Sequence, residues 1–185
     1  DVRLRATMPG GVDPRVVIVD IDEKSLRERE AGGEGRWPWS RDRLALLVNR
    51  LNDDYNVSLT GFDVIFSERD ESSGIRTMDL LAKSELKNDA GFQSQYQRIK
   101  PLLDLDNQFA NSFKDRLVIL GYSFLIPGDN AKKGVLPPEV FTSAQIPFSI
   151  VDPLVREGFT GNLAQLQINA TDGGHINPII DADGI

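Results

Sequence analysis

The 185-residue sequence contains no cysteine, which excludes disulfide bonds, thiolate catalysis and cysteine-ligated zinc. Its single histidine, His175, excludes a metal site built from several histidines. No apolar run approaches the ~18 residues that a membrane-spanning helix needs, and no signal peptide opens the chain. A piece of a longer membrane protein would look the same. The lack of cysteine fits either side of a membrane and therefore indicates no compartment.

Positive charge is also scarce, with 21 Lys and Arg against 28 Asp and Glu and a net charge of −7. No run of basic residues offsets this balance, so a nucleic-acid partner is not expected. Hydrophobic residues make up 40% of the chain, which excludes a disordered chain. The length suits one domain, and we expect a single domain over residues 1–185.

The most apolar stretch near the start, residues 15–21, predicts a strand buried on both faces, as at the centre of a helix-covered sheet. Asp20 and Asp22 are two residues apart and therefore share one side of this strand. They lie at its carboxyl end, where ligands gather in open α/β sheets. Asp22 is also placed to cap a short charged helix over residues 23–30.

A glycine-rich connector and two tryptophans follow. Residues 32–35 lack the flanking strand and the Lys-Ser/Thr pair of a phosphate-binding loop. Trp37 and Trp39 surround a proline, which predicts a rigid anchor that fastens this loop to the sheet; an exposed aromatic platform for a ligand or partner is the alternative. The apolar spacing then predicts a helix over residues 41–52, capped by Ser40.

Residues 57–66 predict a second buried strand, in which Asp63 needs a partner because its run is otherwise apolar. Strand, helix and strand in this order predict a right-handed βαβ unit with a parallel strand pair. Acidic residues on or after both strands are expected to converge on one end of the sheet: Asp20, Asp22, Asp63, Glu68 and Asp70.

Two interpretations of this acidic group stay open. Carboxylates alone suit a hard cation such as Mg²⁺ or Ca²⁺. Alternatively, Asp22 caps a helix, Asp63 takes a salt bridge from Arg36 or Arg41, and the loop after the second strand is solvated. The candidates for a ligand or ion site are Asp20, Asp22, Asp63, Glu68, Arg36 and Arg41. His175 lies between glycines in a segment that favours a turn or structural role.

The rest of the chain alternates helices, loops and strands. The expected elements are helices over 78–86, 96–113 and 163–169, a polar break over 88–95, a strand over 117–121, a loop over 128–138 and a strand pair around 173–180. We therefore predict an α/β fold with a central, mostly parallel sheet and helices on both faces. An antiparallel C-terminal hairpin would turn at residues 181–184 and is cut short at Ile185.

Several motifs, in this order and spacing, resemble the type-two CHASE domain, a family of extracytoplasmic sensor modules of bacterial membrane receptors. They are Val-Ile-Val-Asp-Ile-Asp-Glu-Lys-Ser-Leu, Trp-Pro-Trp-Ser-Arg and Gly-Phe-Asp-Val-Ile-Phe-Ser-Glu. The resemblance resumes at residues 117–121, 170–177 and 181–184, and so covers most of the chain.

The resemblance implies a non-catalytic sensory input domain, without a cofactor, of a histidine kinase or nucleotide cyclase. The domain would be periplasmic or extracellular, anchored to the membrane through flanking segments, and part of a homodimeric receptor. Its stimulus, a small molecule or a protein, is not readable from the sequence. The competing hypothesis is a metal-dependent hydrolase or phosphatase that uses Asp20, Asp22 and Asp63. No other general base and no phosphate cradle support it.

Overall fold

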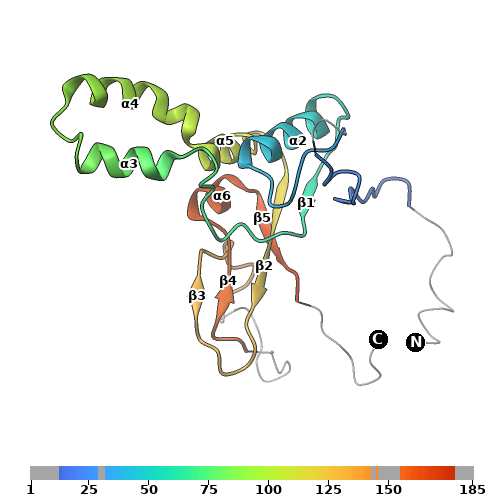
Figure 1. Ribbon diagram of the computed structural model, residues 1–185. Coiled ribbons are helices and arrows are strands. Elements are labelled where there is room, and N and C mark those ends of the chain that lie inside the picture. Colours follow the sequence, from blue (N-terminus) through green and yellow to red (C-terminus); the bar gives the residue numbers. More distant parts are fainter. Residues whose placement is uncertain (1–12, 29–31, 143–144, 146–154, 178–185) are drawn as a thin grey trace, which may run out of the picture. The chain divides into compact units, whose positions relative to one another are not determined.

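The computed structural model describes residues 13–28, 32–142, 145 and 155–177 (Figure 1). The chain divides into two units, Asp1–Trp39 together with Pro178–Ile185, and Ser40–Asn177. All helices and strands in the described residues belong to the second unit. The second unit therefore supplies the framework for the site.

The described part of the first unit is irregular, and the strand predicted over residues 15–21 is wrong. Val16–Val19 are exposed, Ile18 by 88%. A strand persists only when its backbone groups pair with a neighbour, and residues 17–21 make no backbone hydrogen bond to another described residue. The helix predicted over 23–30 is also wrong in its described part, where residues 23–26 form turns.

The helices of the second unit follow the apolar spacing of the sequence. α2 (Arg41–Asp53) confirms the first predicted helix and buries Leu44 and Val48, which lie one turn apart. α6 (Ala164–Asn169) confirms the last. The remaining helices are α3 (Ile75–Lys83), α4 (Ala90–Leu103) and α5 (Leu105–Asn111).

The polar break predicted over residues 88–95 is mostly wrong, because α4 already begins at Ala90. The side chain of Asp89 caps this helix by accepting the backbone N–H of Phe92 at 2.8 Å. Pro101 lies inside α4, two residues before its end. A cap of this kind is a local signal for the start of a helix, which the polar composition of residues 88–95 hides.

The sheet is formed by β1 (Thr60–Phe62), β2 (Val118–Phe124), β3 (Lys132–Lys133), β4 (Phe159–Thr160) and β5 (Asp172–His175). Its order is β1-β2-β4-β3, with β5 also paired to β2. β1 and β5 run parallel to β2, β3 runs parallel to β4, and only the β2–β4 pair is antiparallel. The mostly parallel sheet is thus confirmed, although β1 is much shorter than its predicted strand. The turn and returning strand of the predicted C-terminal hairpin lie outside the described residues.

The core lies against one face of this sheet. Val118 and Leu120 of β2 are fully buried, whereas Ile119 on the opposite face is only half-buried. The core helices α2, α5 and α6 lie side by side, since α2 and α6 both pack against α5. The core side chains include Leu44, Val48, Phe66, Phe109, Phe113 and Leu166. Helices on both faces are not confirmed in the described part of the chain.

α3 and α4 form a helical hairpin, here called the arm (residues 75–103), which extends away from the other elements of its unit in Figure 1. Tyr96 of α4 is its only buried residue, and α3 buries none. The Tyr96 hydroxyl donates to Asp79 at 2.5 Å, and Lys100 pairs with the same carboxylate at 3.0 Å. These contacts hold the two helices together.

The titration of Tyr96 gives a test of the arm. Burial, and then the Asp79 carboxylate, raise the pKa of Tyr96 to about 12, from 10. Because an ionised tyrosine is disfavoured in the fold, stability should be lost as the pH rises through 10 toward 12. Tyrosine absorbance should show a late ionisation step that is missing in Tyr96→Phe. Superimposable titrations of the two proteins above pH 11 would show this environment to be wrong.

Candidate functional site

Arg41 at the start of α2 is a buried cation, only 9% exposed. Its guanidinium lies 4.5 Å from the ring centroid of Phe66, a cation–π distance. Its Nε is 3.4 Å from Oδ1 of Asp106, and its Nη2 donates to the backbone carbonyl of Glu68 at 3.2 Å. Arg41 thus joins α2 to α5 and to the loop that follows β1.

Two carboxylates complete this network. Asp106 of α5, 4% exposed, accepts the backbone N–H of Asp70 at 3.1 Å. The Asp70 carboxylate in turn accepts the backbone N–H groups of Arg41 at 2.6 Å and Ser72 at 2.8 Å. We call Arg41, Asp70 and Asp106 the Arg41 cluster.

The electrostatics of the Arg41 cluster reflect its burial. Burial lowers the pKa of Arg41, although the charges of Asp106 and Asp70 oppose this. Burial raises the pKa of Asp106, despite the Asp70 N–H and the charge of Arg41. Burial also acts to raise the pKa of Asp70, but the hydrogen bonds from Ser72 and Arg41 outweigh it and lower that pKa. Each charge in this cluster therefore depends on the others for compensation.

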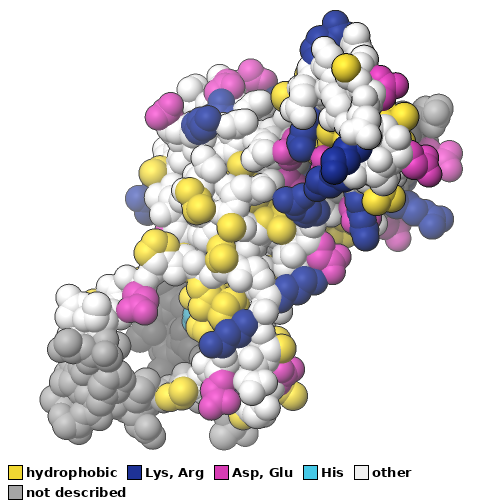
Figure 2. Space-filling model, turned by 90° about the vertical axis from the view of Figure 1, so that its left-hand side faces the viewer, with side chains coloured by type: hydrophobic (Ala, Val, Ile, Leu, Met, Phe, Trp, Pro, Cys, Tyr) yellow, Lys and Arg dark blue, Asp and Glu magenta, His cyan; other side chains and the backbone are white. Residues whose placement is uncertain are grey.

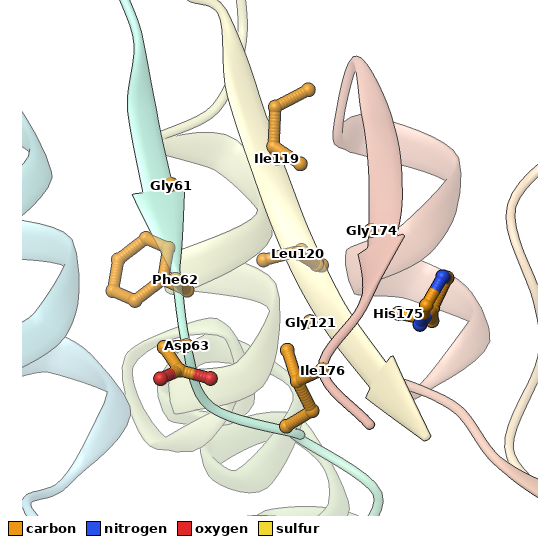
Figure 3. A pocket seen from close by; sticks show the side chains of 9 residues that line it. All are labelled: Gly61, Phe62, Asp63, Ile119, Leu120, Gly121, Gly174, His175 and Ile176. Atoms are coloured by element: carbon orange, nitrogen blue, oxygen red, sulfur yellow. The ribbon is translucent and has the colours of Figure 1, made fainter. Parts of the chain in front are cut away.

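In the described part of the chain, the face of the sheet opposite the core holds a groove of about 300 Å³ (Figure 3). It is lined by Gly61, Phe62, Asp63, Ile119, Leu120, Gly121, Gly174, His175 and Ile176. Glycines from three adjacent strands leave backbone atoms exposed in the groove without side chains over them. At Gly121 a side chain would not fit, because a Cβ would lie only 2.9 Å from the carbonyl oxygen of Phe62. Ile119 and Ile176 add apolar walls, and the carboxylate of Asp63 lies at one end. This chemistry suits a small apolar molecule that carries a positive charge.

A model of the CHASE2 domain family matches residues 1–185, the whole chain. The chain belongs to the CHASE2 domain family. CHASE2 domains are extracytoplasmic and sensory. No curated protein and no solved structure matches the chain. In the described residues of this CHASE2 domain, no helix is long and apolar enough to cross a membrane.

The CHASE2 domain brings together only some of the residues singled out in the sequence. Arg41 and Asp70 meet, and the exposed carboxylate of Glu68 pairs with Lys133 at 2.6 Å. Asp63 is exposed just beyond β1. The predicted salt bridge between Arg41 and Asp63 is wrong, because Arg41 is buried against Asp106 instead.

Asp20, Asp22 and Arg36 belong to the first unit of the CHASE2 domain, and all three are exposed. The Asp22 carboxylate accepts the backbone N–H and the hydroxyl of Ser25, at 2.9 and 2.7 Å, and these bonds lower its pKa. The meeting of Asp20 and Asp22 with Asp63 stays a prediction. Across the described ranges, no group of three or more ligand-type side chains is arranged to hold a metal ion.

The tryptophan pair also lies in the first unit. Trp37 is 38% exposed and Trp39 is half-buried, with ring centroids 5.9 Å apart. Trp39 Nε1–H donates to the carbonyl of Gly35 at 2.9 Å, a hydrogen bond between two residues of the same loop. Anchoring of this loop to the sheet stays a prediction, as does the alternative of a platform.

Asp106 is the residue that sequence reasoning missed, although its helix carries a usable signal. Asp106, Phe109, Ala110 and Phe113 recur at helical spacing, and all four are buried. An acid on an otherwise apolar stripe needs a buried partner. His175 lies in β5 and not in a turn, is exposed, and contacts the rings of Tyr122 and Phe124, with centroids 6.4 and 6.1 Å away. Its structural role stays a prediction.

Proposed function

We propose that this CHASE2 domain is the non-catalytic sensory input domain of a membrane-anchored bacterial receptor whose output domain is a histidine kinase or a nucleotide cyclase. The observation that carries this proposal is the family match over the whole chain. The domain then lies in the periplasm or outside the cell, and flanking segments anchor it. Two protomers that move relative to each other pass the signal across the membrane.

Three acidic residues in or after the loop that follows β1 have structural partners, which a sensor domain accommodates without a metal ion. The carboxylates of Asp70 and Asp106 accept hydrogen bonds from backbone N–H groups, and Asp106 also pairs with the Arg41 guanidinium, so both acids stabilise the fold. Glu68 pairs with Lys133. These bonds account for Glu68, Asp70 and Asp106 without a metal ion. The competing hydrolase would use Asp20, Asp22 and Asp63 instead, and the meeting of those three carboxylates stays a prediction.

We place a small-molecule stimulus in the groove. Its volume is at the lower end of the usual range for ligand pockets, roughly 300–1,000 Å³. Gly61, Gly121 and Gly174 give it a flat floor, and Asp63 offers a negative charge at the rim. A ligand with an apolar body and an amine or guanidinium group satisfies both features.

A thermal-shift screen of the purified chain tests this site. Among amines, amino acids, sugars, peptides and ions, apolar amines should raise the melting temperature, because a ligand that binds the native state stabilises it. Asp63→Asn should abolish the shift, whereas Glu68→Gln, an equal loss of charge at another exposed acid, should keep it. An unchanged shift in Asp63→Asn would place the ligand elsewhere. Metal-dependent phosphoester turnover that is lost in Asp63→Asn would favour the hydrolase.

A further inference from the structure

The arm leaves apolar side chains without a second layer of structure. A helix in a folded domain buries its apolar stripe against another element, yet Tyr96 is the only buried residue of the arm. Leu80 of α3 is 65% exposed and Leu102 of α4 is 71% exposed. The arm therefore has surface to offer a partner.

The outer face of α3 combines this apolar surface with positive charge. Arg76, Leu80 and Lys83 follow one another at i, i+4 and i+7, so they share a face of the helix, and all three are exposed. Arg76 pairs with Glu71 at 2.6 Å, but both side chains are more than half exposed. Exposed ion pairs of this kind contribute little to the free energy of folding and exchange partners readily.

The charge of the arm differs in sign from that of the rest of the chain. Residues 75–103 hold five Lys and Arg against three Asp and Glu, which leaves 16 basic and 25 acidic residues elsewhere. Figure 2 looks from the side on which the arm extends in Figure 1, and its upper part shows Lys and Arg side chains gathered together. A basic projection on an acidic protein is complementary to another copy of that protein.

We propose that the arm is the dimerisation element of this domain, with the Arg76–Leu80–Lys83 face of α3 docked on the acidic body (residues 40–74, 104–142 and 155–177) of a second copy. This inference rests on the proposed function, which requires two protomers. Arm against arm would bring like charges together, whereas arm against body brings unlike charges together. A two-fold axis lets each copy receive the arm of the other.

The base of the arm is built to transmit the position of a docked partner. Asp70 precedes the arm and Asp106 follows it, and the two are bonded to each other and to Arg41. The Ser73 hydroxyl also donates to the carbonyl of Leu103 at 2.5 Å, which joins the two ends of the arm. A displacement of the arm would therefore act on the Arg41 cluster and on α2 and α5.

Sedimentation of the 185-residue chain over a range of concentration and salt tests the arm. The wild type should form a dimer that weakens with salt. Arg76→Glu/Lys83→Glu should raise the dimer Kd about tenfold or more, because both residues face the partner. Lys24→Glu/Arg27→Glu makes the same change in net charge at exposed positions outside both the arm and the acidic body, and should leave the Kd near its wild-type value. Equal melting temperatures would show that both variants fold.

Three results would overturn the proposal. A wild type that stays monomeric at every concentration would show that the chain forms no dimer. An equal rise of the dimer Kd in both variants would show that the arm is not part of the interface. A monomer that binds vesicles of anionic lipid through Arg76 and Lys83 would make a membrane surface the occupant instead. All three leave the ligand shift of the groove unaffected, so the failure of this inference is distinguishable from failure of the proposed function.

Discussion

Asp106→Ala is expected to lower the free energy of unfolding by about 3–5 kcal/mol, because it leaves the buried guanidinium of Arg41 without its carboxylate partner. It also removes the acceptor of the Asp70 backbone N–H. Urea denaturation of the purified chain measures this loss. Glu68→Gln, which breaks only the exposed pair with Lys133, is the control and should change stability little.

The double variant Arg41→Met/Asp106→Leu distinguishes the cost of losing the ion pair from the cost of leaving one buried charge without a partner. Replacing both partners of a buried pair by apolar groups is often neutral, whereas removing one is costly. The double variant should therefore be more stable than Asp106→Ala. Equal losses in the two proteins would contradict the Arg41 cluster as described.

Asn162→Ala is expected to lower the free energy of unfolding by about 2–6 kcal/mol, since it leaves two buried backbone groups without a hydrogen-bond partner, at about 1–3 kcal/mol each. Asn162 is fully buried, and its Oδ1 accepts the backbone N–H of Phe66 at 2.8 Å. Its Nδ2 donates to the carbonyl of Gly121 at 3.0 Å and to Gln167 at 3.2 Å. This one side chain ties the loop after β1 to β2 and α6.

Urea denaturation and amide hydrogen exchange test this role together. The amide hydrogen of Phe66 should exchange faster in Asn162→Ala, because its acceptor is gone. Asn169→Ala is the matched control: its side chain bonds only within α6, to the carbonyl of Gln165, and it should cost far less. Unchanged exchange at Phe66 would mean that Asn162 does not hold this loop.

The parts of the fold that the sequence predicts are those with strong local periodicity. Leu44, Leu47, Val48 and Leu51 repeat at helical spacing and correctly predict α2, and the apolar run around Val118 correctly predicts β2. The run Val16–Val19 fails, because a strand also needs a paired neighbour that no local pattern supplies. An apolar run therefore predicts a strand correctly only where the fold supplies a neighbour for it to pair with.

The site is harder to predict from the sequence than the fold, because its contacts link residues far apart in the chain. The sequence marks Arg41 as a candidate and places Asp70 in the acidic group, but gives no reason to join them to Asp106, which is 36 residues beyond Asp70. Tertiary partners, and not local propensity, decide the Arg41 cluster. The cap of α4 at Asp89 is a local signal by contrast, which the polar composition of residues 88–95 hides.

The central claim, that this is an extracytoplasmic sensor domain, is tested most directly by chemical labelling in intact cells. The chain has no cysteine, so Ser94→Cys, at an exposed position on α4, places a single thiol in it. In cells that make the full-length receptor, a maleimide that cannot cross the cytoplasmic membrane should label this variant above the wild-type background before lysis. Labelling that appears only after the cytoplasmic membrane is broken would contradict the assignment.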